Sequence, residues 1–192
     1  MLKILFVGQT WPGSCARSMK EALAKHPRID LDEMAEDAFT PKVNSKLLRG
    51  LNKVVRPLYR KEFNQQVMEK IRHDRPDFFV TYKGSFVQSD LLQSVADLGI
   101  QTVNIYPDCS PHAHGKAHRK AVGQYNIVIS TKEYHPALWS DLYHYANRCR
   151  FVPQGYDPLL HYRDAPPTSF EYDVVMIATI WSTDSRVSRL VK

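Results

Sequence analysis

Four polar segments of the chain each follow an apolar run that is long enough to form a buried strand. The runs cover residues 2–7, 78–82, 100–105 and 127–129, and the polar segments after them cover residues 8–18, 83–85, 108–115 and 130–132. In an open sheet of parallel strands, ligands bind outside the carboxyl ends of the strands. The arrangement therefore predicts that the four segments meet at one edge of a sheet and form a binding site there.

The segment DCSPHAHG contains residue types that move protons near neutral pH. Histidine titrates in that range, and a carboxylate can act as a base or orient a neighbouring histidine. We predict Asp108, His112 and His114 as catalytic residues. Cys109 and His118 would extend the group to a metal site, but the spacing matches no structural zinc pattern, so no metal is expected. A solvated loop with surface histidines is the alternative.

The glycine-bearing segment GQTWPGSCAR has the outline of a phosphate-binding loop. Gly8 and Gly13 have P-loop spacing, but Ser14 stands where the lysine that contacts the β- and γ-phosphates belongs. Thr10 replaces the second glycine of the dinucleotide fingerprint, where the backbone approaches the pyrophosphate. These differences argue against NTP hydrolysis and NAD binding. At a helix amino terminus, Gly13, Ser14 and Arg17 can still contact an anion or a sugar hydroxyl, unless the segment is only a tight turn.

Segments of helical periodicity alternate with the apolar runs. The first predicted helix follows Ser14 or Ser18 as its N-cap. A second is predicted over residues 43–55, and Pro57 kinks or ends it before a third that runs through residues 63–71. Strands that alternate with helices predict an α/β fold built on a Rossmann-like, doubly wound parallel sheet.

The carboxyl-terminal part of the chain begins a new unit of the same kind. A proline-rich connector precedes an apolar run at residues 174–178, which is followed by a Ser/Thr turn and a helix start. We therefore predict a Rossmann-like domain over residues 1–153, a linker over residues 154–172, and the truncated start of a second α/β domain over residues 173–192.

Positive charge is concentrated in residues 42–61, which contain seven Lys or Arg residues and no Asp or Glu, within a net charge of +6. The segment favours an anionic partner. Nucleic acid is not expected, because no stretch interleaves basic and aromatic residues. Apolar residues recur at helical spacing, so the segment could lie peripherally on an anionic membrane. The alternative is a domain helix with a charged outer face. The apolar positions are Val43, Leu47, Leu51, Val54 and Leu58.

The overall composition is that of a globular protein, with 192 residues of which 43% are hydrophobic. No run of 18 apolar residues is present, so no membrane-spanning helix is expected. The three cysteines lie far apart, which argues against a disulfide framework. We expect a cytoplasmic location, with peripheral contact at the inner membrane face as an alternative.

Six segments, taken in order, resemble the amino-terminal half of GT-B glycosyltransferases of the CgeB-like (spore maturation protein) family. The resemblance implies two Rossmann-like domains that face each other across a cleft. The first would chiefly hold the acceptor and the second the nucleotide-sugar donor, so this chain would be the acceptor-side half. It also implies chemistry without a metal or other cofactor. The segments are ILFVGQTWPGSCARSMKEAL, RPDFFVTYKGSFV, TVNIYPDCSPHAHG, YNIVISTKEYHPAL, FVPQGYDPLLH and YDVVMIAT.

The function implied by this resemblance is transfer of a sugar from a nucleotide-sugar to a hydroxyl group of a glycan, lipid or protein. Asp108, His112 or His114 would take the proton of the acceptor hydroxyl. A non-catalytic Rossmann-like module that binds a sugar or an anion is the alternative. The residues predicted to contact substrate are Gly13, Ser14, Arg17, Lys83, Ser85, Thr131, Lys132 and Tyr156.

Overall fold

A computed structural model describes residues 1–39, 46–110, 113–143 and 148–158, and of residues 46–53 it describes only the backbone. Six strands in this part of the chain form one sheet, and every neighbouring pair of strands is parallel. Their order is β2-β1-β3-β4-β5-β6. The predicted parallel α/β sheet is confirmed. The strands are β1 (Leu2–Gly8), β2 (Ile29–Ala35), β3 (Phe78–Tyr82), β4 (Gln101–Tyr106), β5 (Ile127–Ser130) and β6 (Cys149–Phe151).

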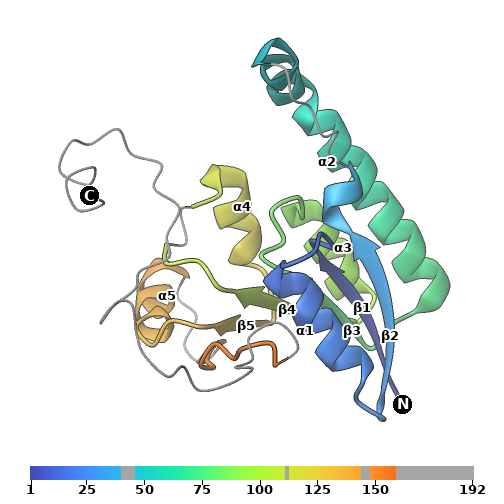
Figure 1. The fold of residues 1–192 in the computed structure, drawn as a ribbon, viewed down its shortest axis with the longest axis vertical. Helices are drawn as coiled ribbons and strands as arrows, with labels where there is room; N and C mark the ends of the chain where they lie inside the picture. Colours follow the sequence, from blue (N-terminus) through green and yellow to red (C-terminus); the bar gives the residue numbers. More distant parts are fainter. Residues whose placement is uncertain (40–45, 111–112, 144–147, 159–192) are drawn as a thin grey trace, which may run out of the picture. The chain divides into compact units, whose positions relative to one another are not determined.

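Helices cover both faces of the sheet, but unequally (Figure 1). They are α1 (Cys15–Ala24), α2 (Lys46–Asp74), α3 (Ser89–Asp97), α4 (Gly115–Val122) and α5 (His135–Tyr143), and a 3₁₀ turn, η1 (Glu36–Phe39), follows β2. On one face, Ala16 of α1 joins a small core of strand residues. On the other face, α2 to α5 build a larger core that includes Phe63, Leu92, Val122 and Trp139.

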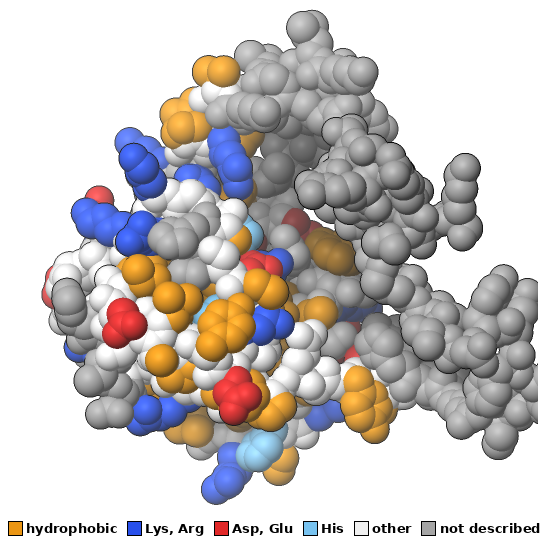
Figure 2. Space-filling view, turned by 90° about the vertical axis from the view of Figure 1, so that its left-hand side faces the viewer, with side chains coloured by type: hydrophobic (Ala, Val, Ile, Leu, Met, Phe, Trp, Pro, Cys, Tyr) orange, Lys and Arg blue, Asp and Glu red, His pale blue; other side chains and the backbone are white. Residues whose placement is uncertain are grey.

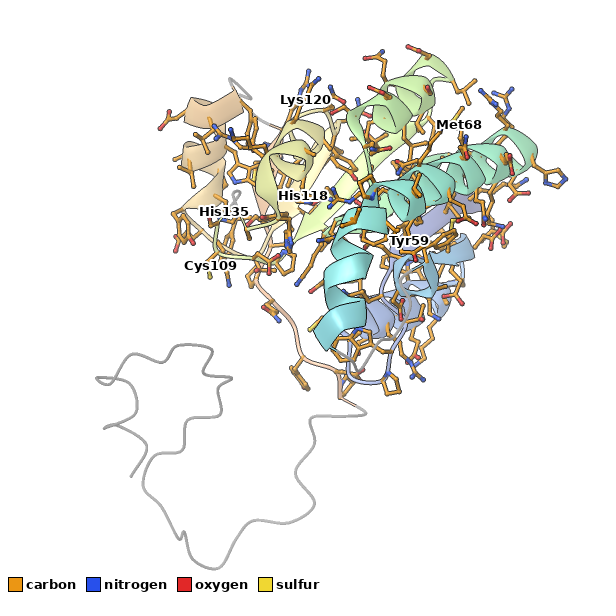
Figure 3. All side chains as sticks on the ribbon, turned by 90° about the horizontal axis from the view of Figure 1, so that it is seen from above. Tyr59, Met68, Cys109, His118, Lys120 and His135 are labelled. Atoms are coloured by element: carbon orange, nitrogen blue, oxygen red, sulfur yellow. The ribbon has the colours of Figure 1, made fainter. Side chains whose placement is uncertain are left out.

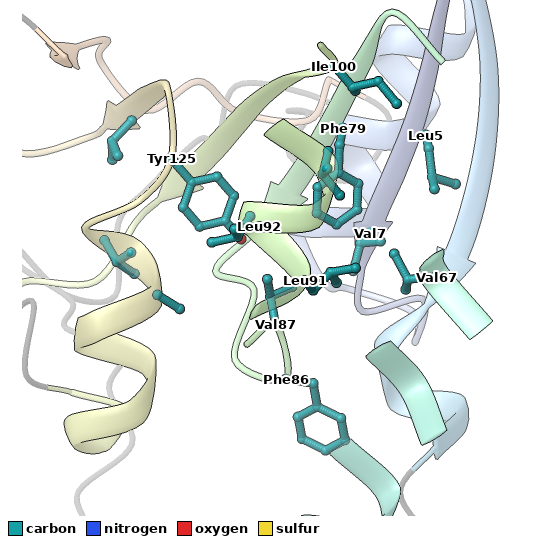
Figure 4. Packing of buried hydrophobic residues seen from close by; sticks show 14 of the residues in the cluster. Leu5, Val7, Val67, Phe79, Phe86, Val87, Leu91, Leu92, Ile100 and Tyr125 are labelled. Atoms are coloured by element: carbon teal, nitrogen blue, oxygen red, sulfur yellow. The ribbon is translucent and has the colours of Figure 1, made fainter. Parts of the chain in front are cut away.

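The strands are apolar at successive positions because both of their faces are covered. In β1, Leu5 and Val7 point into the larger core, while Ile4 and Phe6 point into the smaller one. Figure 4 shows Leu5, Val7 and Phe79 lining the larger core beside side chains of α2 and α3. Burial on both faces explains why these segments read as continuous apolar runs in the sequence.

The strand order contains one reversal, between β1 and β3. The chain moves outward from β1 to β2 and then returns past β1 to continue with β3, β4, β5 and β6. In doubly wound sheets, the loops that follow the two strands at such a switch point diverge, and ligands bind between them. The fold therefore places the loops after β1 and β3 at the usual ligand position.

The region around Pro57 differs from the prediction of two separate helices. The structure has one helix, α2, which runs through Pro57 to Asp74. A proline removes one hydrogen bond and bends a helix, but its φ angle is helical. No further proline or glycine follows within the helix. Phe63, Val67 and Ile71 also anchor the second half in the core. The predicted end of the helix at Pro57 is therefore wrong, whereas a kink at Pro57, the other predicted outcome, stays a prediction.

The amino-terminal boundary of α1 agrees with the first of its two predicted caps. Ser14 is the N-cap residue, and its hydroxyl accepts a hydrogen bond from the backbone N–H of Ala16 at 3.2 Å. This bond satisfies one of the free amides of the first helical turn.

The predicted division of the chain at residues 153 and 172 stays a prediction. Residues 1–157 form one compact unit. Most of the proposed linker and the proposed second-domain start lie outside the described residues. In the part of the chain that is described, no helix is long and apolar enough to cross a membrane.

Candidate active site at the carboxyl edge of the sheet

The loops after β1, β2, β3 and β4 are joined by polar contacts at the carboxyl edge of the sheet. Asp37, after β2, accepts hydrogen bonds from the backbone N–H and the hydroxyl of Thr10, after β1, at 2.9 and 3.3 Å. Ser85, after β3, donates to Glu36 at 2.5 Å. Lys83 forms an ion pair with Asp108, after β4. Polar segments that are far apart in the sequence are thus brought to one edge.

Asp108 is the centre of a charged cluster at this edge. One carboxylate oxygen lies 3.2 Å from the ammonium nitrogen of Lys83, and the other lies 2.6 Å from Nε2 of His114. The three side chains are 26–29% exposed, so they are held by the protein and still accessible to a ligand. The hydrogen bond with His114, together with the charge of Lys83, holds the pKa of Asp108 below its usual value against the opposing effect of burial.

The geometry separates the roles of Asp108 and His114. An ionised carboxylate can only accept hydrogen bonds, so we assign the proton between the two groups to Nε2 of His114. This tautomer leaves the lone pair of the ring on Nδ1. Asp108 is a poor base, because its pKa is lowered and both of its oxygens are engaged. The pair can therefore act as a base through His114, with Asp108 orienting the ring and stabilising its protonated form.

The loop that carries Lys83 has an unusual backbone. Lys83 and Gly84 have φ angles of +64° and +67°. The left-handed conformation costs a non-glycine residue about 1–2 kcal/mol. The carbonyl of Lys83 accepts hydrogen bonds from Nε2 of His118 at 2.8 Å and from the amide of Asn104 at 3.0 Å. These contacts from α4 and β4 hold the strained turn in place, and the turn directs Lys83 toward Asp108.

The contact of His118 with the carbonyl of Lys83 stabilises the fold of the loop after β3. Its side chain is buried, and burial lowers its pKa to about 4, so the ring is neutral at neutral pH. Figure 3 shows His118 near Cys109 and His135 at the same end of the molecule. Among the described residues, no group of three possible ligands is close enough to hold a metal ion. His112 lies outside the described residues, and the absence of a metal requirement stays a prediction.

Glu36 is a residue of the site that the sequence pattern did not identify. It is 4% exposed, and burial raises its pKa, although the hydrogen bond from Ser85 partly offsets this effect. Its second oxygen has no hydrogen-bond partner among the described residues. Arg60 of α2 donates to the backbone carbonyl of Ser85 at 3.2 Å. The predicted substrate residue Ser85 is therefore held from two sides.

A recognisable signal for Glu36 is present in the sequence. The alternation of Ile29 and Leu31 with charged residues suggests a short strand, whereas β2 continues to Ala35. Glu36 thus follows the carboxyl end of a strand, as do the residues that were identified. If the strand is taken to end at Ala35, the rule that ligands bind outside the carboxyl ends of parallel strands also selects Glu36.

In the loop after β1, two of the predicted substrate residues make local contacts. Ser14 is 3% exposed and serves as the cap of α1, and its hydroxyl also donates to the carbonyl of Gln9 at 3.3 Å. Arg17 forms an ion pair with Glu21 at 2.8 Å, one helical turn later. Gly13 has a φ angle of +84°, which a turn residue with a side chain rarely adopts. These contacts account for the loop as a tight turn, and its role in substrate binding stays a prediction.

The loop after β5 contacts the segment that carries Asp108. The hydroxyl of Thr131 donates to the carbonyl of Pro107 at 3.4 Å, and Tyr134 donates to the carbonyl of Cys109 at 2.7 Å. Lys132 is half-buried, and its backbone N–H bonds the hydroxyl of Ser130 at 3.0 Å. Thr131 and Tyr134 thus hold the backbone on both sides of Asp108.

Tyr156 is 73% exposed and follows β6 in the part of the predicted linker that the structure describes. The described contacts do not join it to the Asp108 cluster. Its assignment as a substrate residue stays a prediction.

Replacement of Asp108 by asparagine is expected to lower the free energy of unfolding at pH 7 by about 1 kcal/mol. Because the folded state lowers the pKa of Asp108, its contribution is complete above the unfolded-state pKa of about 3.9 and is lost as the pH falls through the lower folded-state value. The difference between wild type and variant should therefore shrink below about pH 4. Urea unfolding at several pH values measures it, and a difference that is the same at every pH would contradict the expectation.

No protein-family model and no curated protein sequence matches the chain. Among solved structures, it is similar to S. aureus MnaA in a co-structure with UDP, with a TM-score of 0.52 and 12% identity over 79% of this chain and 43% of that one. It is also similar to UDP-GlcNAc 2-epimerase from Methanocaldococcus jannaschii, with a TM-score of 0.53 and 10% identity over 79% of this chain and 45% of that one. The chain thus covers less than half of each structure. Together with the sheet topology, these similarities confirm the predicted Rossmann-like α/β fold.

Proposed function

We propose that this chain is the acceptor-side half of a GT-B enzyme that transfers a sugar from a nucleotide-sugar to a hydroxyl group. The observation that carries the proposal is the cluster of Lys83, Asp108 and His114 at the carboxyl edge of the sheet. It supplies an oriented base that is partly accessible, next to the strand switch point where such folds bind ligands.

In the proposed reaction, Nδ1 of His114 takes the proton of the acceptor hydroxyl. The acceptor oxygen then forms a bond to the anomeric carbon of the donor sugar, and the bond between that carbon and the phosphate oxygen breaks. The nucleoside diphosphate leaves with the electron pair of the broken bond. Asp108 stabilises the imidazolium that forms, and Lys83 keeps Asp108 ionised through their ion pair.

The choice of a nucleotide-sugar as co-substrate is supported by the names of the two similar structures, one of which contains UDP while the other is a UDP-GlcNAc 2-epimerase. Their identity to this chain is 12% and 10%, so we take the donor class, and not a particular sugar, from the comparison. In line with the resemblance of the sequence, we assign the donor chiefly to a second domain. The acceptor is a hydroxyl group of a glycan, a lipid or a protein, and no metal or other cofactor takes part.

Titration calorimetry of the 192-residue chain tests the acceptor part of the proposal. We expect measurable binding of saccharides and much weaker binding of UDP-sugars, with no release of UDP by this chain alone. A longer natural protein that contains the chain should release UDP from a UDP-sugar when an acceptor is present. If saccharides bind but the longer protein releases no UDP, the chain would be a saccharide-binding module and not part of a transferase. Absence of saccharide binding would refute the acceptor-side assignment.

A further inference from the structure

The first half of α2 extends beyond the core of the domain. None of the described side chains from Val54 to Glu62 is buried, and Phe63 is the first buried residue among the side chains of α2 that the structure describes. In Figure 1 the amino-terminal end of α2 protrudes from the sheet and from the other helices. Among the described side chains of α2, burial in the core of residues 1–157 therefore begins only in the second half of the helix.

The helix carries two apolar stripes that face in opposite directions. Phe63 and Val67 are fully buried in the core, whereas Val54 and Leu58 are 75% and 65% exposed. Val54 precedes Phe63 by nine residues, and Leu58 precedes Val67 by nine. At 3.6 residues per turn, nine residues make two and a half turns, which places the two stripes about 180° apart. Val54 and Leu58 thus cannot join the core that anchors the helix.

Over the described side chains of residues 54–61, this finding argues against a simple domain helix with a charged outer face. In such a helix the apolar residues would face the core and the charged residues would face solvent. Here two of the apolar residues that repeat at helical spacing face solvent. Leu47 and Leu51 precede them at the same spacing in the sequence, although their side chains lie outside the described part.

Positive charge predominates around the exposed stripe up to Lys61, and the exposed Glu62, four residues after Leu58, is the first acidic residue beside it. Residues 42–61 contain seven Lys or Arg residues and no Asp or Glu. Lys61 follows Leu58 by three residues and is exposed, so it borders the stripe. Two other cations, Arg56 and Arg60, lie over the ring of Phe86 at 5.6 and 5.7 Å. Figure 2 shows hydrophobic and basic side chains next to each other at the upper end of the molecule.

We propose that the amino-terminal half of α2, residues 46–61, binds the surface of an anionic phospholipid membrane, with Val54 and Leu58 inserted among the lipids. An amphipathic helix binds such a surface through its buried apolar area and through attraction between its cations and anionic headgroups. A protein partner could also cover the exposed stripe, but twenty consecutive residues without an acidic side chain favour a surface of uniform negative charge, such as an anionic membrane. The inference does not depend on the proposed sugar transfer.

Co-sedimentation with lipid vesicles tests the inference. The chain should bind vesicles of phosphatidylcholine with 30% phosphatidylglycerol, and binding should fall when the salt is raised, because the electrostatic attraction is screened. Vesicles of phosphatidylcholine alone should bind it weakly. Val54→Ser combined with Leu58→Ser should lower binding to the anionic vesicles about tenfold or more, since the inserted apolar area is lost.

A matched control replaces one leucine and one valine that are also exposed but lie outside α2. Leu2 and Val152 are each 48% exposed, and Leu2→Ser combined with Val152→Ser should leave vesicle binding unchanged. Circular dichroism checks that both double variants are folded. Failure of the wild-type chain to bind anionic vesicles would overturn the proposal, as would equal binding by the two double variants. A dimer that is lost only in the α2 variant, without vesicle binding, would assign the stripe to a protein interface and would also refute it.

Discussion

Replacement of His114 by glutamine is expected to lower kcat of the proposed sugar transfer about 10²- to 10⁴-fold, the range that a positioned general base contributes. The amide nitrogen of glutamine can still donate to Asp108, whose oxygen lies 2.6 Å from Nε2 of His114. The amide has no basic nitrogen to take the proton of the acceptor. The change should thus affect kcat more than KM, because the contacts that position the loop are kept.

His73 provides a control with the same local chemistry. Its Nδ1 lies 2.5 Å from the carboxylate of Asp74, but the side chain is 88% exposed at the carboxyl end of α2. His73→Gln should leave kcat unchanged. Steady-state rates of UDP release measure both variants in a protein that carries the transfer activity. A His114→Gln variant with wild-type kcat would remove His114 from the proposed chemistry.

Replacement of Gly84 by alanine is expected to lower the free energy of unfolding by about 3 kcal/mol. The left-handed φ angle of +67° accounts for about 1–2 kcal/mol of this loss. The rest comes from steric conflict, because an added Cβ would lie 2.8 Å from the hydroxyl of Tyr125 and 3.0 Å from that of Thr81. These two hydroxyls form a buried hydrogen bond at 2.9 Å, and a lost buried bond costs about 1–3 kcal/mol.

Gly99 separates the backbone effect from the steric one. Its φ angle is +75°, but an added Cβ would meet no atom within 4 Å. Gly99→Ala should therefore cost only the conformational strain, about 1–2 kcal/mol. Urea unfolding of both variants, followed by circular dichroism, measures the difference. Equal losses of unfolding free energy in the two variants would show that steric conflict with Tyr125 and Thr81 does not contribute at Gly84.

The position of the site can be predicted from the sequence more fully than the contacts within the site. Apolar runs before residues 83–85 and 108–115 predict buried strands, and the parallel sheet places the ends of these strands at one edge. Asp108 and His114 are close in the chain and belong to one loop, so their proximity is largely a local property. Lys83 reaches Asp108 from the neighbouring strand, which requires only the strand order and the turn at Gly84.

The sequence indicates only in part which polar groups make contacts within the protein, since it predicts Ser14 as a candidate helix cap but does not predict the burial of Glu36. Serine is a residue type that often contacts ligands, but Ser14 is buried as the cap of α1. Glu36 looks like an ordinary surface acid, but the loop after β3 covers it and donates a hydrogen bond to it. The contacts of Ser14 are local, whereas the burial of Glu36 depends on how closely the loop after β3 approaches it, and that distance is set by packing between distant segments.

The sequence by itself determined the alternation of strands and helices, the parallel sheet and the edge at which its polar loops meet, because strand and helix periods are local properties of the chain. Only the tertiary structure decided which apolar stripe of α2 enters the core. Val54 and Leu58 have the same helical spacing as Phe63 and Val67, yet they lie on the opposite face. Periodicity defines an apolar face, but burial depends on whether a sheet lies opposite that face, and the sheet beside α2 reaches only its second half.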